Sequence, residues 1–338
     1  MATTTSTIGT GKDYTTIQAW EDARNNTDQN TGYCEAEVFA AVLFSGLTYT
    51  ATNYPHLTAK LGAEHDGRAN EVSAKGNARI ESTADSIIIN IQDEFIRISW
   101  LEVKGPGNLN RHAVSVSVVS TCTICIHHCI IHNNLANANP YGINVNDADV
   151  ASDVYRNMVY GYAYGVVYLA AANNSVIHCN TLYSHAAAGE YTGNAATVIS
   201  NNAAFANASK DFYDITGVMD YNASSDGTAD DEGANSIANL TTANQFVNPT
   251  TTWAQTDLLH KLGAGIIGEG LDLSAQKATY PEIDVSIRNG ATRATITGAW
   301  DIGADQYEAA AAVGHPAVRR FGGVEFCGNH KNQGMRVW

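Results

Sequence analysis

Five six-residue segments in the middle of the chain can be laid over one another, and this repeat constrains the fold more than any other feature. The first position of each segment is β-branched and aliphatic, and the sixth is always apolar. The segments begin at Ile98, Ile126, Val154, Ile177 and Ile199. The steps between them are 28, 28, 23 and 22 residues. A period of this length is typical of stacked supersecondary units.

The residues around these anchors alternate between apolar and polar, as Val114, Val116 and Val118 show. An alternation with a period of two indicates strands and argues against a helical solenoid. The repeat therefore predicts an all-β parallel β-helix in which equivalent residues lie one rung apart, about 4.8 Å. We expect the five anchors to form one internal aliphatic row.

The fourth position of the repeat reads Leu, Cys, Asn, Asn, Asn. Asn157, Asn180 and Asn202 would then stack as an internal ladder at a turn. Because a buried polar row must be hydrogen-bonded, their amides are expected to bond to one another and to the turn backbone.

The start of the chain predicts a short capping helix. Thr15 followed three residues later by Gln18 has the pattern of a capping box. Ile17, Trp20 and Ala23 then recur at helical spacing, which predicts an amphipathic helix from about residue 15 to 24. Its apolar face would cover the open end of the strand stack.

The regular repeat fades after residue 211, and short strands are expected from 235 to 307. A run of four alanines, 309–312, then precedes a basic tail. The predicted organisation is an N-terminal cap (1–30), a parallel β-helix (31–308) and an extended C-terminal arm for assembly (309–338).

The charge of the chain is unevenly distributed. The whole chain carries −15, but residues 309–338 contain four basic residues and one acidic residue, which leaves about −18 for the rest. An acidic body argues against nucleic acid as a partner. The polar first ten residues lack the features of a secretion signal, and no window is apolar enough to enter a membrane.

Three segments resemble right-handed, single-stranded parallel β-helix proteins. They are the opening stretch 8–17, the stretch 257–270 and the closing Trp300-Asp301-Ile302-Gly303-Ala304-Asp305-Gln306-Tyr307-Glu308. In the second stretch, Ala264-Gly265 replaces the Ser-Pro that is usual in the family. The resemblance covers roughly residues 8–308 and implies the fold. It implies little about function, because β-helices include lyases, hydrolases, adhesins and spikes.

The tail from His315 to Trp338 is similar to the C-terminal arms of tailed-phage structural proteins. This resemblance implies a virion structural protein, such as a capsid decoration, a head fibre or a tail spike, assembled in the host cytoplasm. It also implies other virion subunits as partners and a homotrimer as the favoured oligomer. The arm residues expected at the interface are Arg319, Arg320, Phe321, Phe326, Arg336 and Trp338.

An alternative function is the cleavage of polysaccharides by a lyase or a glycoside hydrolase, as in a tailspike depolymerase. A glycosidase needs two carboxyl groups, and a lyase needs a base together with charge neutralisation. The candidates are Glu190, Asp211 and Asp214, with Lys210 beside them in sequence. The signatures of pectate lyases and polygalacturonases are absent from the chain. No cofactor is expected.

A third possibility is a non-catalytic adhesin that binds a host surface glycan. Six tyrosines cluster over two rungs: Tyr155, Tyr160, Tyr162, Tyr164, Tyr168 and Tyr183. Tyrosines on the outer face of a sheet can stack on sugar rings or fill a subunit interface.

Two groups of residues have the composition of metal sites. The first comprises Cys122, Cys125, Cys129, His127, His128 and His132. Strand alternation points these side chains in different directions, so we expect core cysteines and surface histidines instead of a zinc site. The second is an acidic loop whose candidate calcium ligands are Asp226, Asp230, Asp231 and Glu232. A solvated acidic loop is the alternative for this second group.

Overall fold

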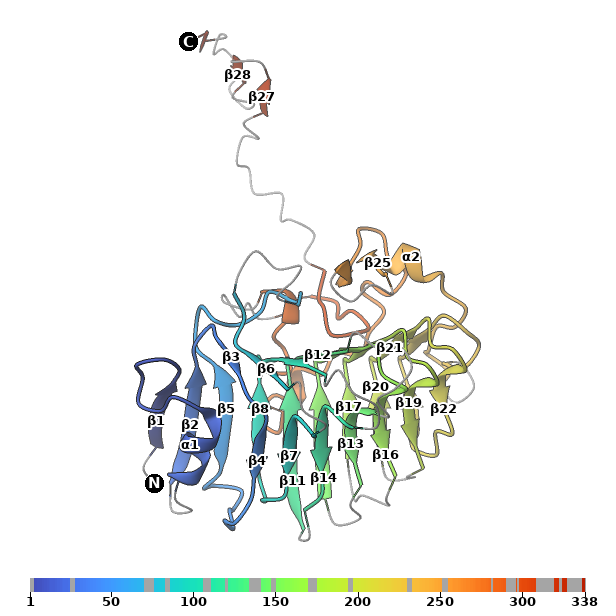
Figure 1. Ribbon diagram of the computed structural model, residues 1–338. Coiled ribbons are helices and arrows are strands. Elements are labelled where there is room, and N and C mark those ends of the chain that lie inside the picture. Colours follow the sequence, from blue (N-terminus) through green and yellow to red (C-terminus); the bar gives the residue numbers. More distant parts are fainter. Residues whose placement is uncertain are drawn as a thin grey trace. The chain divides into compact units, whose positions relative to one another are not determined.

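The computed structural model shows three parallel sheets wound around a common interior (Figure 1). It describes residues 3–24, 28–69, 76–82, 86–105, 111–118, 121–133, 141–146, 150–169, 175–193, 197–229, 233–250, 255–280, 282–289, 296, 298–307, 319–321, 324–326 and 336–337. The chain divides into two compact units, 1–307 and 308–338, which are described separately. None of the helices in the described residues has the length and apolarity needed to span a bilayer.

The complete coils of the first unit, from β2 (Gln29–Cys34) to β22 (Lys210–Tyr213), each contribute one strand to each of the three sheets, here named sheets A, B and C. Sheet A contains β1 (Thr3–Ile8), β2 (Gln29–Cys34), β5 (Pro55–Ala59), β8 (Arg97–Ser99), β11 (Cys122–His127), β14 (Val150–Tyr155), β17 (Val176–His178), β20 (Val198–Ser200) and β23 (Val218–Asp220). Sheet B contains β3 (Val38–Phe39), β6 (Arg79–Glu81), β9 (Glu102–Lys104), β12 (Ile130–His132), β15 (Met158–Tyr160), β18 (Thr181–Tyr183), β21 (Ala203–Phe205) and β24 (Ala223–Ser224). Sheet C contains β4 (Val42–Phe44), β7 (Ile89–Ile91), β10 (Val114–Val116), β13 (Tyr141–Val145), β16 (Tyr164–Tyr168), β19 (Ala188–Thr192) and β22 (Lys210–Tyr213). The chain is therefore a parallel β-helix, as predicted.

The predicted aliphatic row is confirmed in sheet A. Ile98, Ile126, Val154, Ile177 and Ile199 are register partners on successive strands. Each is at most 1% exposed and lies in the main hydrophobic core. The row is continuous because each β-branched side chain packs on its counterpart one rung away.

The asparagine ladder is also confirmed, and Asn222 extends it by one rung. The Nδ2 of Asn157 donates to Oδ1 of Asn180 at 3.0 Å, and Nδ2 of Asn180 donates to Oδ1 of Asn202 at 3.0 Å. Each of these amides also donates to a carbonyl of the preceding coil, such as Ile126 O at 2.9 Å. Each Oδ1 also accepts a backbone N–H one rung away, so the buried ladder is hydrogen-bonded along its length.

The residue before each ladder position adopts the left-handed backbone conformation, with φ between 53° and 59°. These residues, here called the turn row, are Trp100, His128, Arg156, Cys179, Asn201 and Tyr221. This conformation costs a non-glycine residue on the order of 1 kcal/mol. The turn can persist because the ladder amides bind the backbone N–H that follows it.

The N-terminal cap differs in detail from the prediction. Helix α1 (Ile17–Asp22) begins after Thr16, whose hydroxyl accepts from Ala19 N at 3.0 Å. The N-cap is therefore one residue later than the predicted capping box. Trp20 is 2% exposed and contacts Gly32, where a Cβ would lie 2.7 Å from the indole. The residues predicted as a cap also include β1, the first strand of sheet A.

The parallel coils end earlier than the predicted boundary at residue 308. The last paired strand of sheet B is β24, and a short antiparallel pair follows, β25 (Phe246–Asn248) with β26 (Asp257–His260). The remaining helical elements of this unit are α2 (Thr242–Gln245), η2 (Ser274–Gln276) and η3 (Ile287–Asn289). The last part of this unit, residues 257–307, is here named the covering segment.

The covering segment packs against the turn row on the outside of the coils. Arg156 donates from Nε to Ile283 O at 3.0 Å and from Nη1 to Gly303 O at 3.2 Å. Asn201 forms a reciprocal pair of hydrogen bonds with the backbone of Leu271. The covering segment therefore adds no further coil to the β-helix and instead covers the outer surface of earlier coils. The two-residue alternation in the sequence could not reveal this arrangement.

The second unit contains three short antiparallel strands: β27 (Arg319–Phe321), β28 (Val324–Phe326) and β29 (Arg336–Val337). The predicted extended C-terminal arm therefore contains strands that pair with one another. The side chains of Arg319, Arg320, Phe321, Phe326 and Arg336 lie outside the described residues, and so does Trp338. Their predicted role at an interface stays a prediction.

Replacing Asn180 by alanine should test the ladder. Asn180→Ala removes the acceptor for two donors of Asn157, both of which are buried. We expect the free energy of unfolding to fall by about 3 kcal/mol, because buried unsatisfied donors are costly. Urea denaturation monitored by circular dichroism measures the change. Asn244→Ala, at an exposed position of α2, is the matched control and should change stability by less than about 0.5 kcal/mol. Equal effects of the two substitutions would contradict the ladder.

Candidate functional sites

The three acids predicted to be catalytic lie in different surroundings. Glu190 pairs in register with Val166 and Phe212, is 0% exposed and faces the interior. Burial raises the pKa of its carboxyl group well above the usual range, because a charge is costly inside the protein. Asp211 is also buried, whereas Asp214 is exposed. The three acids thus differ in burial and surroundings, and their catalytic role stays a prediction.

Asp211 organises a loop. Its Oδ2 accepts from the backbone N and the hydroxyl of Ser225, both at 2.6 Å, and its Oδ1 accepts from Asn207 Nδ2 at 2.7 Å. Burial raises the pKa of Asp211, and these hydrogen bonds oppose the increase. The carboxylate is therefore engaged with the protein and is not directed toward a substrate.

The predicted calcium loop is described only in part. Asp226 accepts from Asp211 N at 3.0 Å and from Thr228 N at 3.0 Å, so both of its oxygens support the turn. Asp230, Asp231 and Glu232 lie outside the described residues. Calcium binding at this loop therefore stays a prediction.

Five of the six predicted surface tyrosines are buried, and only Tyr164 is partly exposed. Tyr162 and Tyr168 are fully buried in the main core. The others lie on the outer side of sheets A and B, where Tyr155 contacts Tyr280 at 6.2 Å between ring centroids and Tyr183 contacts Phe246 at 6.5 Å. A residue that faces outward from a strand was expected to meet solvent, but residues 246–307 cover this part of the wall.

The same cover corrects the expectation for the histidines. His127, His128 and His132 were predicted on the surface, and each is at most 2% exposed.

The cysteines behave as expected. Among the described residues, five are buried free thiols: Cys34, Cys122, Cys125, Cys129 and Cys179. Burial raises the pKa of Cys125 and Cys129 to about 12, so neither is a thiolate nucleophile at neutral pH.

A row of aromatic rings is left uncovered on the outside of sheet C, and the sequence analysis missed most of it. The rings belong to His112, Tyr141, Tyr164, Tyr191 and Tyr213, all partly or fully exposed. Successive centroids are 4.8, 5.6, 6.2 and 5.6 Å apart. Tyr164 is tilted by 58° and 55° against its two neighbours, which leaves part of the ring faces open. We name this set the aromatic row.

Charged groups lie beside the aromatic row at its C-terminal end. Lys210 Nζ lies 5.9 Å from the ring centroid of Tyr213. Partial desolvation and the neighbouring Asp214 carboxylate raise the pKa of Tyr191, so its hydroxyl remains protonated over the physiological range. The row therefore combines apolar ring surface with hydrogen-bonding groups and one charge of each sign.

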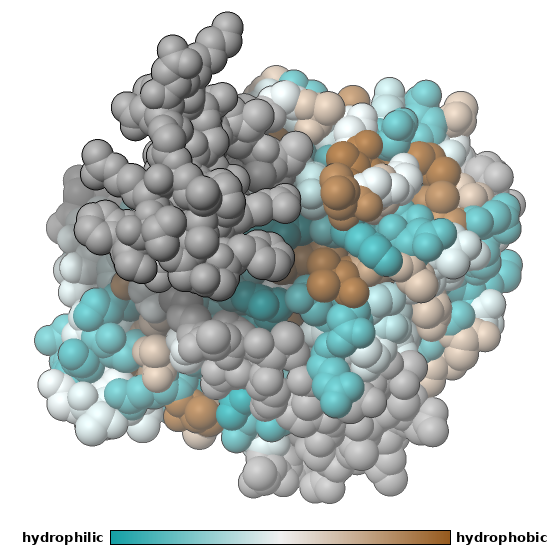
Figure 2. Space-filling model, turned by 90° about the horizontal axis from the view of Figure 1, so that it is seen from above, coloured by the Kyte–Doolittle hydropathy of each residue, from teal (hydrophilic) through white to brown (hydrophobic). Residues whose placement is uncertain are grey.

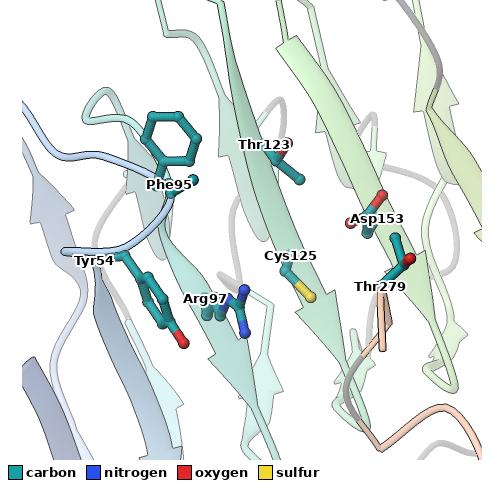
Figure 3. A pocket seen from close by; sticks show the side chains of 8 residues that line it. Tyr54, Phe95, Arg97, Thr123, Cys125, Asp153 and Thr279 are labelled. Atoms are coloured by element: carbon teal, nitrogen blue, oxygen red, sulfur yellow. The ribbon is translucent and has the colours of Figure 1, made fainter. Parts of the chain in front are cut away.

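A cavity of about 190 Å³ lies outside sheet A (Figure 3). Arg97, Cys125 and Asp153 occupy one register on three successive strands, and Tyr54 and Phe95 complete much of the wall. The Arg97 guanidinium carbon lies 4.1 Å from the Tyr54 ring centroid. Burial raises the pKa of Asp153 to about 7, and the charge of Arg97 opposes the increase. The cavity is small for a ligand pocket.

The chemistry of this cavity is limited. Asp153 could exchange a proton near neutral pH, and Arg97 could neutralise an anion. Among the described residues that line the cavity, Asp153 is the one carboxyl group, whereas a glycosidase needs two. The cavity alone therefore does not make the protein a glycosidase.

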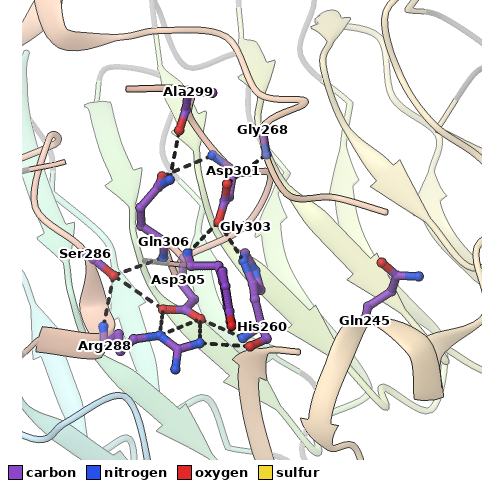
Figure 4. A network of polar contacts seen from close by, with 12 residues as sticks. Gln245, His260, Gly268, Ser286, Arg288, Ala299, Asp301, Gly303, Asp305 and Gln306 are labelled. Carbon is purple, nitrogen blue, oxygen red and sulfur yellow. Dashed lines mark hydrogen bonds and ion pairs between the residues drawn. The ribbon is translucent and has the colours of Figure 1, made fainter. Parts of the chain in front are cut away.

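The closing motif forms a polar network that serves the fold (Figure 4). Asp305 accepts from Arg288 Nε at 2.9 Å and from His260 N at 2.6 Å, and Arg288 Nη2 also contacts Asp305. Asp301 accepts from Gly268 N at 2.8 Å and from His260 Nδ1 at 3.3 Å. Since these acids are buried and fully engaged, they fasten parts of the covering segment to one another.

Exposed hydrophobic side chains are scattered over the described surface. The most exposed are Leu262, Leu61 and Val218, which come from separate parts of the sequence. On the face seen from above, hydrophobic groups are separated by hydrophilic ones (Figure 2). Isolated apolar side chains are normal for a protein surface and do not identify an interface.

No protein-family model matches the chain, and no curated protein sequence matches it. Among solved structures, it is similar to the pectin methylesterase from Aspergillus niger, a β-helix enzyme, with a TM-score of 0.34 and 13% sequence identity. The match covers 74% of this chain and 93% of that chain.

The titration of Asp153 can be tested through stability. Its pKa in the folded protein, about 7, lies above the unfolded value of 3.8, so its favourable contribution is present below pH 3.8 and is lost as the pH rises through 7. Asp153→Asn removes this loss. We expect the variant to gain about 2 to 4 kcal/mol relative to the wild type between pH 4 and pH 8, because one pKa unit corresponds to 1.36 kcal/mol.

Chemical denaturation of both proteins at several pH values measures this difference. Asp22→Asn, at an exposed position of α1, is the control and should show no comparable change with pH. Parallel pH profiles for the wild type and Asp153→Asn would mean that Asp153 titrates as an ordinary carboxyl group.

Proposed function

We propose that the protein is a non-catalytic glycan-binding protein whose contact surface is the aromatic row of sheet C. The observation that carries the proposal is the row itself: partly exposed rings on neighbouring strands, each within 6.2 Å of the next. Because tyrosine combines an apolar ring with a polar tip, such rings suit ligands that have both apolar and hydroxyl-bearing faces, as sugars do. A row along the coils suits an extended polymer.

The charged groups beside the row support this assignment. The Tyr191 hydroxyl remains a donor, and Asp214 and Lys210 offer an acceptor and a cation within the same surface. Polar groups of this kind give orientation and specificity to a mainly aromatic contact surface. The fold holds them on strands, which position a binding surface more precisely than loops do.

A binding role is favoured over cleavage by the positions of the acids. Glu190 faces the interior, Asp211 is engaged with a loop, and Asp214 is exposed beside a tyrosine. Within the described residues, no two of these three carboxyl groups flank a common cleft. Polysaccharide lyase or glycoside hydrolase activity is the alternative, and it would use other residues, with Asp153 and Arg97 as the first candidates.

The binding proposal predicts the effect of removing single rings. Tyr191→Ala and Tyr213→Ala should each weaken glycan binding about fivefold to tenfold, since a stacked ring contributes about 1 kcal/mol. Tyr191→Phe should retain most of the binding. Retention on an array of immobilised polysaccharides, followed by titration with the best ligand, measures the effect. Tyr33→Ala, a partly exposed tyrosine of β2 outside the row, is the control.

The same ligands should be incubated with the protein and assayed for new reducing ends and unsaturated uronates. Binding without product formation supports an adhesin. Product formation that disappears in Asp153→Asn would establish the enzymatic alternative. If Tyr191→Ala and Tyr213→Ala both bind glycan as the wild type does, the aromatic row is not the binding surface.

A second proposal concerns where the protein acts, and the separate C-terminal unit favours it. We propose that residues 308–338 attach the β-helix to neighbouring subunits of a virion, as a decoration, head fibre or tail spike. The unit has its own antiparallel sheet, and its charge of about +2 opposes the −17 of residues 1–307. Opposite charges speed and orient the docking of an arm onto an acidic neighbour.

Truncation after Tyr307 tests the attachment role. We expect the full chain to form a trimer or larger assembly and the truncated chain to be a folded monomer, as measured by size-exclusion chromatography with light scattering. Circular dichroism serves as the folding control. The same oligomeric state for both chains would contradict this role.

A further inference from the structure

Three side chains with metal-binding groups meet where β11 is covered by the covering segment. His127 ends the strand, His128 follows it in the turn row, and Glu282 approaches from the covering segment. Their ligand atoms all lie within 4.8 Å of one another. The two histidines are 2% and 0% exposed, whereas Glu282 is partly exposed. The cluster is thus enclosed, with one ligand toward solvent.

The hydrogen bonds of His128 prepare it to act as a ligand. Its Nε2 lies 2.7 Å from Val285 O, and because a carbonyl can only accept, Nε2 carries the proton. In the neutral ring, Nδ1 then presents its lone pair toward Nδ1 of His127, 2.9 Å away. Histidines that bind metals usually donate the other ring N–H to a carbonyl or carboxylate in this way.

The three side chains are held in place by their neighbours. The His128 ring stacks on Trp100 at 4.4 Å, and the His127 ring stacks on Tyr155 at 4.8 Å. The Trp100 indole donates to Glu282 Oε2 at 2.7 Å, which orients the carboxylate. Glu282 adopts a left-handed backbone conformation with φ of 60°, a strained conformation for this residue type. These contacts hold the ligands close together, and binding a cation requires the proton between the two Nδ1 atoms to leave.

We propose that His127, His128 and Glu282 bind one Zn²⁺ ion, which fastens the covering segment to the β-helix. Two imidazoles and a carboxylate are a common zinc ligand set, and water fills the fourth position of a tetrahedral site. With Zn–N distances of about 2.1 Å, the two nitrogens must lie about 3.4 Å apart, so the rings separate by about 0.5 Å. The ion joins residues that are more than 150 positions apart in sequence.

This ligand set differs from the cysteine and histidine cluster of the sequence. Cys129 lies in the main core, and Cys125 lines the cavity outside sheet A. The third ligand comes instead from Glu282, which only the folding back of the covering segment brings to His127 and His128.

The test uses the full-length protein loaded with Zn²⁺ and freed of excess metal by gel filtration. We expect one equivalent of zinc by elemental analysis, and a dissociation constant about 100-fold weaker or more in His128→Gln and in Glu282→Gln. His178→Gln is the matched control, because His178 is a buried outward-facing histidine of the same sheet that is not one of the three ligands. Circular dichroism of the metal-free proteins verifies that the variants fold.

Two further measurements separate this site from other possibilities. X-ray absorption at the zinc edge should show nitrogen and oxygen neighbours without sulfur. Zinc at 100 times its dissociation constant should raise the ratio of folded to unfolded wild-type protein about 100-fold, with no such effect in Glu282→Gln. Sulfur ligation, substoichiometric zinc in the wild type, or unchanged affinity in the folded Glu282→Gln variant would overturn the proposal.

Discussion

The hydrogen bonding of a buried turn is the constraint on which the rest of the molecule depends. In six successive coils the chain passes from sheet A to sheet B through a residue in the left-handed conformation, and in five of these turn-row positions that residue is not asparagine. Asn157, Asn180, Asn202 and Asn222 make this tolerable, because their side chains bind the backbone of the neighbouring coil. Each coil thereby fixes the register of the next.

The turn row also determines what happens outside the coils. A left-handed residue projects its side chain from the wall, and Arg156, His128 and Asn201 use this projection to bind the covering segment. That contact hides part of the outer surface of sheets A and B and leaves the aromatic row of sheet C uncovered. The packing of the covering segment against the coils thus accounts for both proposals. It leaves the proposed glycan surface exposed, and it brings the proposed zinc ligands together.

The repeat was predictable because it is local. The β-branched anchors and the asparagines recur at fixed positions, so the parallel coils, the aliphatic row and the ladder all followed from the sequence. The site predictions failed where they assumed that outward means exposed. Tyr155 and His127 do face outward from sheet A, yet both are buried. Glu190, with no local signal to mark its direction, faces the interior.

The sequence by itself determined the stacking of coils, the acidic body and the basic tail, since periodicity and charge are properties of neighbouring residues. Only the tertiary structure decided which faces of the coils meet solvent. It placed Glu282 beside His127 and His128 and joined the tyrosines of sheet C into one row. The physical reason is that such contacts depend on how the covering segment folds back over distant coils, and no local pattern encodes that path.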